Sequence, residues 1–160
     1  MTFKYDNVYL NEVSTVTGPY EKKGPIGKLF DKSYNDLYCS AKTWEQAEVK
    51  LILESVNILL NKLNKNIYDV DLHISGDLLN QISASTYGLA QQNRPFLGIY
   101  SACATSIEGM LIAATFIDSK KIKTAIAATS SHNMSSEKQF RNPTEYGAPR
   151  PKTATFTATG

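Results

Sequence analysis

Cys103 is the residue whose type and surroundings offer the most chemistry in this 160-residue chain. The apolar run over residues 95–100 predicts a short buried strand, and the run over residues 107–117 predicts a helix. Cys103 therefore lies on an elbow between strand and helix, beside the positive end of the helix dipole. Free backbone N–H groups at such an elbow favour a thiolate or a bound anion. The alternative is that Cys103 is a small buried apolar residue, as lone cysteines often are.

A second polar stretch follows the strand that we expect over residues 121–128. It has the sequence Thr-Ser-Ser-His-Asn and ends at Asn133. Ligands of α/β proteins bind at the carboxyl ends of parallel strands, so this stretch is a candidate site. His73, by contrast, lies inside a predicted strand over residues 70–75, where a structural role is the better interpretation.

The remaining pattern predicts the elements that position these residues. Thr43 opens the clearest helix, because Gln46 follows at capping-box spacing and apolar residues then recur at helical spacing up to Leu63. In this interpretation Glu45, Glu48, Lys50, Glu54 and Lys62 form its polar side. Further strands are expected over residues 7–17 and 153–159, a further helix over 78–92 and a loop over 135–147. Alternating strands and helices with short links predict an α/β fold with a mainly parallel sheet and helices on both faces.

Composition narrows the class of protein. With 160 residues, 42% of them hydrophobic, residues 1–160 are expected to form a single domain. A net charge of +2 gives no reason to expect a nucleic-acid partner. The two cysteines do not make a disulfide framework, and we see neither a signal peptide nor an apolar run near the length of a membrane span. We therefore expect synthesis in the cytoplasm.

The helix that follows Cys103 is apolar on nearly every side, with Glu108 as the main exception. A helix of this kind has to be covered all round. A three-layer domain of this length has little chain left to cover it, so a further layer or another chain is expected against it.

Several long motifs, in the same order along the chain, resemble the stage V sporulation protein AD family, which has a thiolase fold. The resemblance runs from end to end, although Ser101 and Ala104 stand where Gly and Ser are expected. The motifs are Gly24–Asp31, Asp36–Cys39, Trp44–Glu48, Gly76–Gln81, Gly98–Ser106, Ser130–Asn133 and Gln139–Gly147.

The resemblance implies a thiolase-like αβαβα architecture made of two similar halves, of which residues 1–160 are the first. The second half is expected to be absent, and a homodimer or another chain would then supply it. The family also implies that the protein binds dipicolinic acid. It would serve the SpoVA membrane-channel proteins that move dipicolinate into the developing spore and out at germination, from the surface of the spore inner membrane.

A dianion such as dipicolinate needs N–H donors, a cation and an apolar wall. Arg141 could supply the cation or instead pair with Glu145, and Asp77 could close the pocket or cap the following helix. The candidate ligand-binding residues are Cys103, His132, Ser130, Ser131, Arg141, Asp77, Asn80 and Gln81.

We expect neither enzyme activity nor a metal or cofactor. In thiolases and ketoacyl synthases the base and the oxyanion donors come from the second half, and a thiol alone does not suffice. Two alternatives stay open: an acyl-transferring enzyme that uses Cys103, and a truncated fragment that only packs against a partner.

Overall fold

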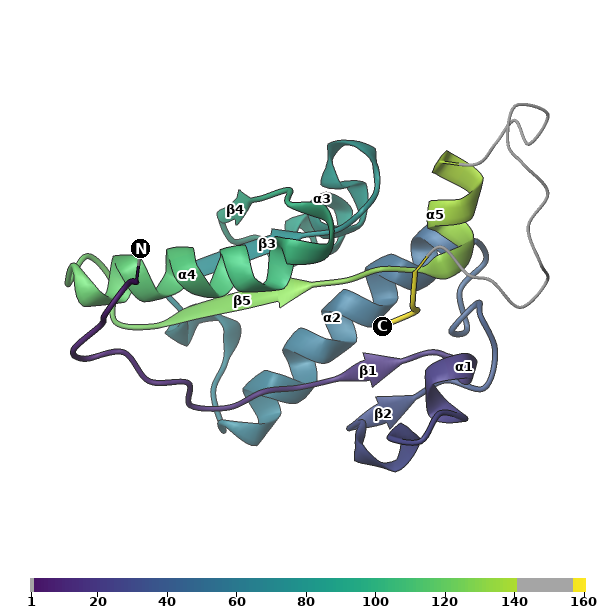
Figure 1. Cartoon of the computed structure of the whole chain (residues 1–160), viewed down its shortest axis with the longest axis horizontal. Coiled ribbons are helices and arrows are strands. Elements are labelled where there is room, and N and C mark those ends of the chain that lie inside the picture. Colours follow the sequence, from purple (N-terminus) through teal and green to yellow (C-terminus); the bar gives the residue numbers. More distant parts are fainter. Residues whose placement is uncertain (1, 141–156) are drawn as a thin grey trace.

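The structure is a computed structural model and describes residues 2–140 and 157–160. Its strands form two parallel sheets, a pair β1–β2 and a three-stranded sheet in the order β4–β3–β5 (Figure 1). The strands are β1 (Val16–Thr17), β2 (Lys32–Ser33), β3 (Leu72–Gly76), β4 (Phe96–Gly98) and β5 (Ala125–Thr129). The α-helices are α1 (Pro19–Lys22), α2 (Trp44–Lys62), α3 (Ser83–Ala90), α4 (Thr105–Asp118) and α5 (Asn133–Phe140).

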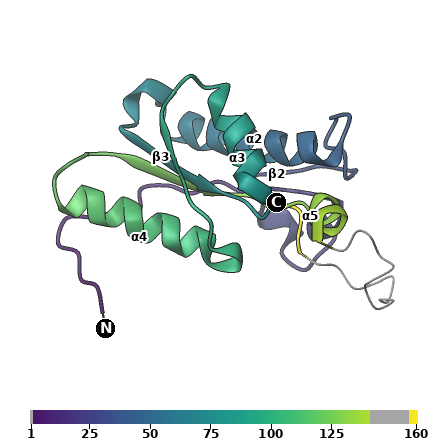
Figure 2. The same ribbon diagram turned by 90° about the horizontal axis from the view of Figure 1, so that it is seen from above.

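The three-stranded sheet lies between two layers of helices. Helix α4 covers one face, whereas α2 and α3 cover the other (Figure 2). Ile74 of β3 lies opposite Leu97 of β4 and Ala127 of β5. Strand, helix and parallel strand follow one another twice, from β3 through α3 to β4 and from β4 through α4 to β5. This confirms the predicted α/β fold with parallel strands and helices on both faces.

Helix α2 begins where the capping pattern predicts. The Thr43 hydroxyl accepts a hydrogen bond from the Gln46 backbone N–H at 3.2 Å. The Gln46 side chain accepts in return from the N–H of Lys42, one residue before the expected partner, at 3.2 Å. The buried face of the helix is formed by Ala47, Glu48, Leu51, Ile52, Val56 and Leu60.

Helix α4 packs on the sheet through its small residues and leaves large apolar ones outside. Gly109 and Ala113 are buried, and a Cβ added to Gly109 would lie 3.3 Å from the Cβ of Ala127. The exposed apolar face of α4 is formed by Ile107, Met110, Leu111 and Phe116. Within the described residues, no helix combines the length and the hydropathy that crossing a bilayer requires.

Two predicted strands differ from the structure. The strand expected over residues 7–17 is present only at Val16–Thr17. The Thr15 carbonyl still accepts from the Lys32 N–H of β2, but other groups of the preceding residues bond to side chains or to helix α2. The Thr15 N–H, for example, donates to the Asp31 carboxylate at 2.8 Å. The run over residues 95–100 does form β4, but at the edge of the sheet, so its expected burial is wrong and Tyr100 is 55% exposed.

The loop expected over residues 135–147 begins instead as helix α5. Its described part is polar, and it is held by Lys138, which donates to the Glu45 carboxylate of α2 at 2.6 Å. Periodicity could not reveal this helix because it has no apolar stripe. The predicted strand over residues 153–159 lies mostly outside the described residues.

Residues 157–160 connect segments that are far apart in the sequence. Gly160 exchanges two backbone hydrogen bonds with Ser131, at 2.9 and 3.0 Å, and the Gly18 N–H donates to the Thr159 carbonyl at 2.9 Å. The Thr159 N–H donates to the Glu21 carboxylate at 3.1 Å, and its hydroxyl donates to the Asn133 side chain at 2.7 Å. The segment that follows β1 is thereby joined to the segment that follows β5.

Candidate functional site

Cys103 lies on a 3-10 turn, Ala102–Ala104, between β4 and α4, and its thiol is free and exposed. The predicted elbow is confirmed, and the alternative of a buried apolar cysteine is wrong. The turn is tight, since Ala102 has a φ of 47°, in the left-handed region. Thr105 fixes it: its hydroxyl donates to the Ala102 carbonyl at 2.8 Å and accepts from the Ser101 N–H at 3.1 Å.

Gly76 brings the end of β3 against this turn. A Cβ added there would lie 2.2 Å from the carbonyl oxygen of Ile99 and 2.7 Å from Cγ2 of Thr105. No side chain fits in that space, so the approach depends on glycine. Asp77, the next residue, therefore follows directly after the point where β3 contacts the elbow.

The Asp77 carboxylate is buried and accepts hydrogen bonds from two backbone N–H groups, those of Leu79 at 2.9 Å and Ser85 at 2.7 Å. Ser85 belongs to the first turn of α3, so the capping interpretation of Asp77 is confirmed. Asn80 and Gln81 follow as exposed residues, and the Asn80 N–H donates to the Gln139 side chain of α5 at 3.0 Å.

His132 is completely buried, and both of its ring nitrogens have partners. Nε2 lies 2.7 Å from the Leu37 carbonyl oxygen, and Nδ1 accepts from the Met134 N–H at 3.2 Å. A carbonyl only accepts hydrogen bonds, so the proton is on Nε2 and the ring is neutral. Burial lowers the pKa of His132 and keeps it in this form.

The two serines before His132 also bond within the protein. The Ser130 hydroxyl donates to Glu48 Oε1 at 3.4 Å, and the Ser131 hydroxyl donates to the Ala158 carbonyl at 2.8 Å. Ser130 is buried, whereas Ser131 is only partly buried. Arg141, the remaining candidate, lies outside the described residues.

Glu48 of α2 is the residue at the centre of this arrangement, and its expected place on the polar side of the helix is wrong. It is fully buried. Its Oε2 lies 2.6 Å from the Ser135 hydroxyl, which also reaches the His132 carbonyl at 2.9 Å. A protonated Glu48 that donates to Ser135 satisfies both contacts. The sequence does carry a signal, since Leu51 and Ile52, three and four residues on, are apolar and share its helix face.

Burial raises the pKa of Glu48 to about 8, and the negative charges of Asp77 and Glu45 act in the same direction. Hydrogen bonds that Ser135 and Ser130 donate to the ionised carboxylate oppose this shift only in part. We call Glu48, Asp77, Ser130, His132 and Ser135 the Glu48 cluster. It is a buried polar network at the carboxyl ends of β3 and β5, and Cys103 lies outside it on the exposed elbow.

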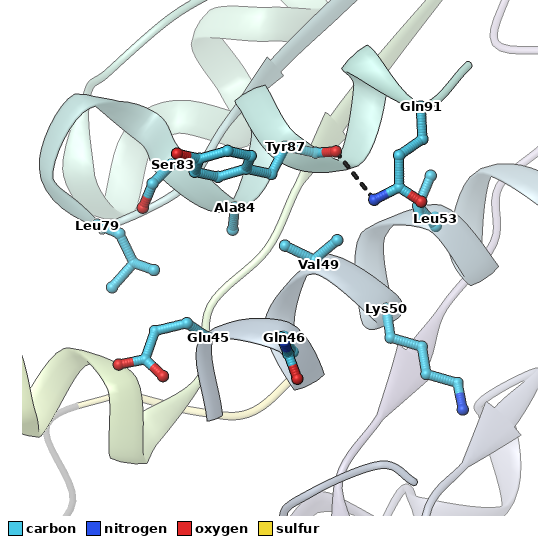
Figure 3. A pocket seen from close by; sticks show the side chains of 10 residues that line it. All are labelled: Glu45, Gln46, Val49, Lys50, Leu53, Leu79, Ser83, Ala84, Tyr87 and Gln91. Atoms are coloured by element: carbon cyan, nitrogen blue, oxygen red, sulfur yellow. Dashed lines mark hydrogen bonds between the residues drawn. The ribbon is translucent and has the colours of Figure 1, made fainter. Parts of the chain in front are cut away.

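A separate groove of about 690 Å³ lies between α2 and α3 (Figure 3). Its walls come from Val49 and Leu53 of α2 and from Ala84 and Tyr87 of α3, and the Tyr87 carbonyl accepts from the Gln91 side chain at 3.1 Å. The groove does not include Cys103 or His132. Among the described residues, no three His, Cys, Asp or Glu side chains gather in a way that could hold a metal ion.

Comparison with known proteins confirms the family that the motifs of the sequence indicate. The family model for stage V sporulation protein AD matches residues 1–160. The chain belongs to this family. It is 46% identical over 153 residues to stage V sporulation protein AD of Bacillus subtilis (strain 168), a match that covers 96% of this chain and 45% of that relative. The chain thus spans less than half the length of the curated relative that it matches.

Proposed function

We propose that the chain is the first half of a thiolase-like sporulation protein that binds dipicolinic acid at the carboxyl edge of its three-stranded sheet. The observation that carries this proposal is the exposed Cys103 thiol on a tight turn directly before α4. The N-terminus of α4 follows directly and has no side-chain cap, and the positive end of a helix dipole favours an anion.

The candidate residues divide into two roles in this proposal. Cys103 lies against the ligand, and the exposed Asn80 and Gln81 close over it. Asp77, Ser130 and His132 already use their polar groups within the protein, so they hold the turns that shape the edge. Direct contact of His132 with the ligand would require its hydrogen bond to Leu37 to open.

Calorimetric titration of the intact protein with dipicolinate tests the proposal. Replacing Cys103 with Trp fills the site and should abolish the binding heat, whereas the matched Cys103→Ser variant keeps the volume and should bind. His132→Ala should weaken binding by releasing the turn. If Cys103→Trp and His132→Ala both bind as tightly as the parent, the site lies elsewhere and the proposal is wrong.

The exposed apolar face of α4 supports a second part of the proposal, that another polypeptide covers this helix. Ile107 is 63% exposed, and large exposed apolar patches mark interaction surfaces. The cover would be a second copy of the chain or a chain that supplies the other half of the fold. We further propose that the assembly serves the SpoVA channel proteins at the inner membrane of the spore.

Sedimentation tests this interface. The parent should sediment as a dimer, and Ile107→Lys should convert it to a monomer because the charge would be buried on association. The control is Thr86→Lys, on an exposed position of α3 in the opposite layer. A parent that is monomeric and does not bind a hydrophobic dye would rule the interface out.

We propose that the chain has no thiolase or ketoacyl-synthase turnover of its own. A base must approach the thiol for acyl transfer. His73 is buried within β3 and the His132 ring is bonded to backbone groups, so neither is poised for this role. Release of a condensed product after acylation of Cys103 by an acyl-coenzyme A would contradict this.

A further inference from the structure

Helix α5 is held on α2 by two contacts that lie one helical turn apart. The inner contact joins the Ser135 hydroxyl to Oε2 of Glu48 at 2.6 Å, and the outer contact joins Lys138 to the Glu45 carboxylate at 2.6 Å. The side chains of Lys138 and Glu45 are 55% and 42% exposed, so their ion pair contributes little to docking. The inner contact is buried, and it therefore decides how firmly α5 is docked.

The inner contact depends on a proton carried by Glu48. The Ser135 hydroxyl has one proton and lies near two acceptors, Oε2 of Glu48 at 2.6 Å and the His132 carbonyl at 2.9 Å. A carbonyl only accepts, so both contacts are hydrogen bonds only when Ser135 donates to His132 and Glu48 donates to Ser135. An ionised Glu48 would instead take the proton of Ser135, and the contact of Ser135 with the His132 carbonyl would be lost.

The ionisable groups around Glu48 oppose its ionisation. Asp77, from the end of β3, is a buried carboxylate, and Glu45, one turn earlier on α2, is kept ionised because the hydrogen bond from Lys138 lowers its pKa. The ring of His132, from the turn after β5, is neutral. A charge on Glu48 would thus join two negative charges in a place without water, and burial with these charges raises the pKa of Glu48 to about 8.

Helix α5 connects Glu48 to the loop at the end of β3. His132 caps the first turn of α5, since its Nδ1 accepts from the Met134 N–H at 3.2 Å. In the last turn of the helix, the Gln139 side chain accepts from the Asn80 N–H at 3.0 Å. Gln81 follows Asn80 with a φ of 58°, in the left-handed region. A displacement of α5 therefore removes a contact that fixes this tight loop.

We propose that Glu48 is a proton switch for helix α5. The neutral carboxyl donates to Ser135 and docks α5 on α2, whereas the ionised carboxylate releases α5 and, with it, the contact between Gln139 and Asn80. Docking is thus firmest at low pH and weakens as pH rises, because the docked state holds a proton that the released state gives up. The switch goes beyond the proposed function, and only its effect on dipicolinate, through Asn80 and Gln81, rests on that function.

Amide hydrogen exchange measured by NMR between pH 6.5 and 9 tests the switch in the intact protein. The Ser136 N–H donates to the His132 carbonyl at 3.0 Å, so its protection, relative to an unstructured chain, reports the docking of α5. Protection of the Ser136 and Asn80 amides should fall together, by up to about tenfold per pH unit, and level off above about pH 8. The amide of Leu51, in the buried part of α2, should stay better protected at every pH. In Glu48→Gln, whose amide donates at every pH, Ser136 protection should be constant.

Glu45→Gln is the matched control, because it removes the outer contact and keeps the inner one. It should lower Ser136 protection throughout this range without abolishing the pH dependence. The fall should level off at a lower pH, since a negative charge near Glu48 is lost. Constant Ser136 protection in the parent, a pH dependence that persists in Glu48→Gln, or Ser136 protection equal to that of Leu51 would each overturn the proposal. None of these measurements uses a ligand, so a failure to bind dipicolinate would count against the proposed function alone.

Discussion

The Glu48 cluster and the Cys103 elbow occupy neighbouring strand ends and have opposite physical character. In the cluster, buried polar groups pair with one another and with the backbone, and water has no access to Glu48 or His132. At the elbow, the thiol is exposed and the first turn of α4 has no side-chain cap. The polar groups of the motif that contains His132 are thus used within the protein, whereas the motif that contains Cys103 leaves a thiol exposed.

Removal of the Glu48 side chain should have the largest effect. Glu48→Ala leaves the buried Ser130 hydroxyl unpaired, removes one of the two partners of the Ser135 hydroxyl and opens a cavity, so the free energy of unfolding should fall by about 3 kcal/mol. Glu48→Gln keeps the shape and a donor and should cost about 1 kcal/mol or less. Denaturant unfolding measures both. Equal losses in the two variants would show that charge, and not hydrogen bonding, sets the role of Glu48.

Gly76→Ala should have the second largest effect, because it affects the contact between the Cys103 elbow and the Glu48 cluster. The added methyl group overlaps the Ile99 carbonyl, so β3 or the elbow has to move, at a cost of about 2 kcal/mol. The reactivity of the Cys103 thiol should change at the same time. Ser106→Ala, on the exposed surface of α4, is the control and should leave both stability and reactivity unchanged.

The pH dependence of stability should report on Glu48. The pKa of Glu48 is raised to about 8 in the folded state, so between its unfolded pKa and pH 8 the folded state holds a proton that the unfolded state has released. Stability should therefore fall as pH rises, by up to about 1.4 kcal/mol per pH unit, and level off above pH 8.

Histidines act in the opposite direction at lower pH. Burial lowers the pKa of His73 to about 4, so its contribution to stability rises with pH up to its ordinary value of 6.5. Between about pH 6.5 and 8 the change in stability reports on Glu48 alone, and the stability of the Glu48→Gln variant should not change with pH in this window. A parent that is also flat in this window would mean that Glu48 is not protonated.

Substitution of Cys103 should have the smallest effect on stability, and thiol labelling should distinguish the two cysteines clearly. Cys103 is exposed and should react with a maleimide in the native protein, whereas Cys39 is buried, and burial raises the pKa of its thiol to about 11. Mass spectrometry should find one label before unfolding and two afterwards. Cys103→Ser should change stability by less than about 0.5 kcal/mol and remove only the native label.

The sequence predicts the positions of the main helices and strands better than the buried polar contacts between them. Helical spacing and the Thr43 cap locate α2, and the strand–turn–helix pattern locates the elbow. The burial of Glu48 is not predicted, because a charged residue is by default assigned to the solvent side of a helix. Its burial depends on contacts with residues more than eighty positions away in the sequence. Helix α5 is not predicted for a related reason: polar contacts hold it in place, and such contacts leave no apolar periodicity in the sequence.

Residues 157–160 have a consequence for the order in which the chain can fold. Their hydrogen bonds to Gly18, Glu21, Ser131 and Asn133 span up to 138 positions in the sequence. During synthesis, the segments after β1 and β5 leave the ribosome long before their common partner does. The junction between the two sheets can therefore form only after residues 157–160 have been synthesised, and contacts of such long range form slowly.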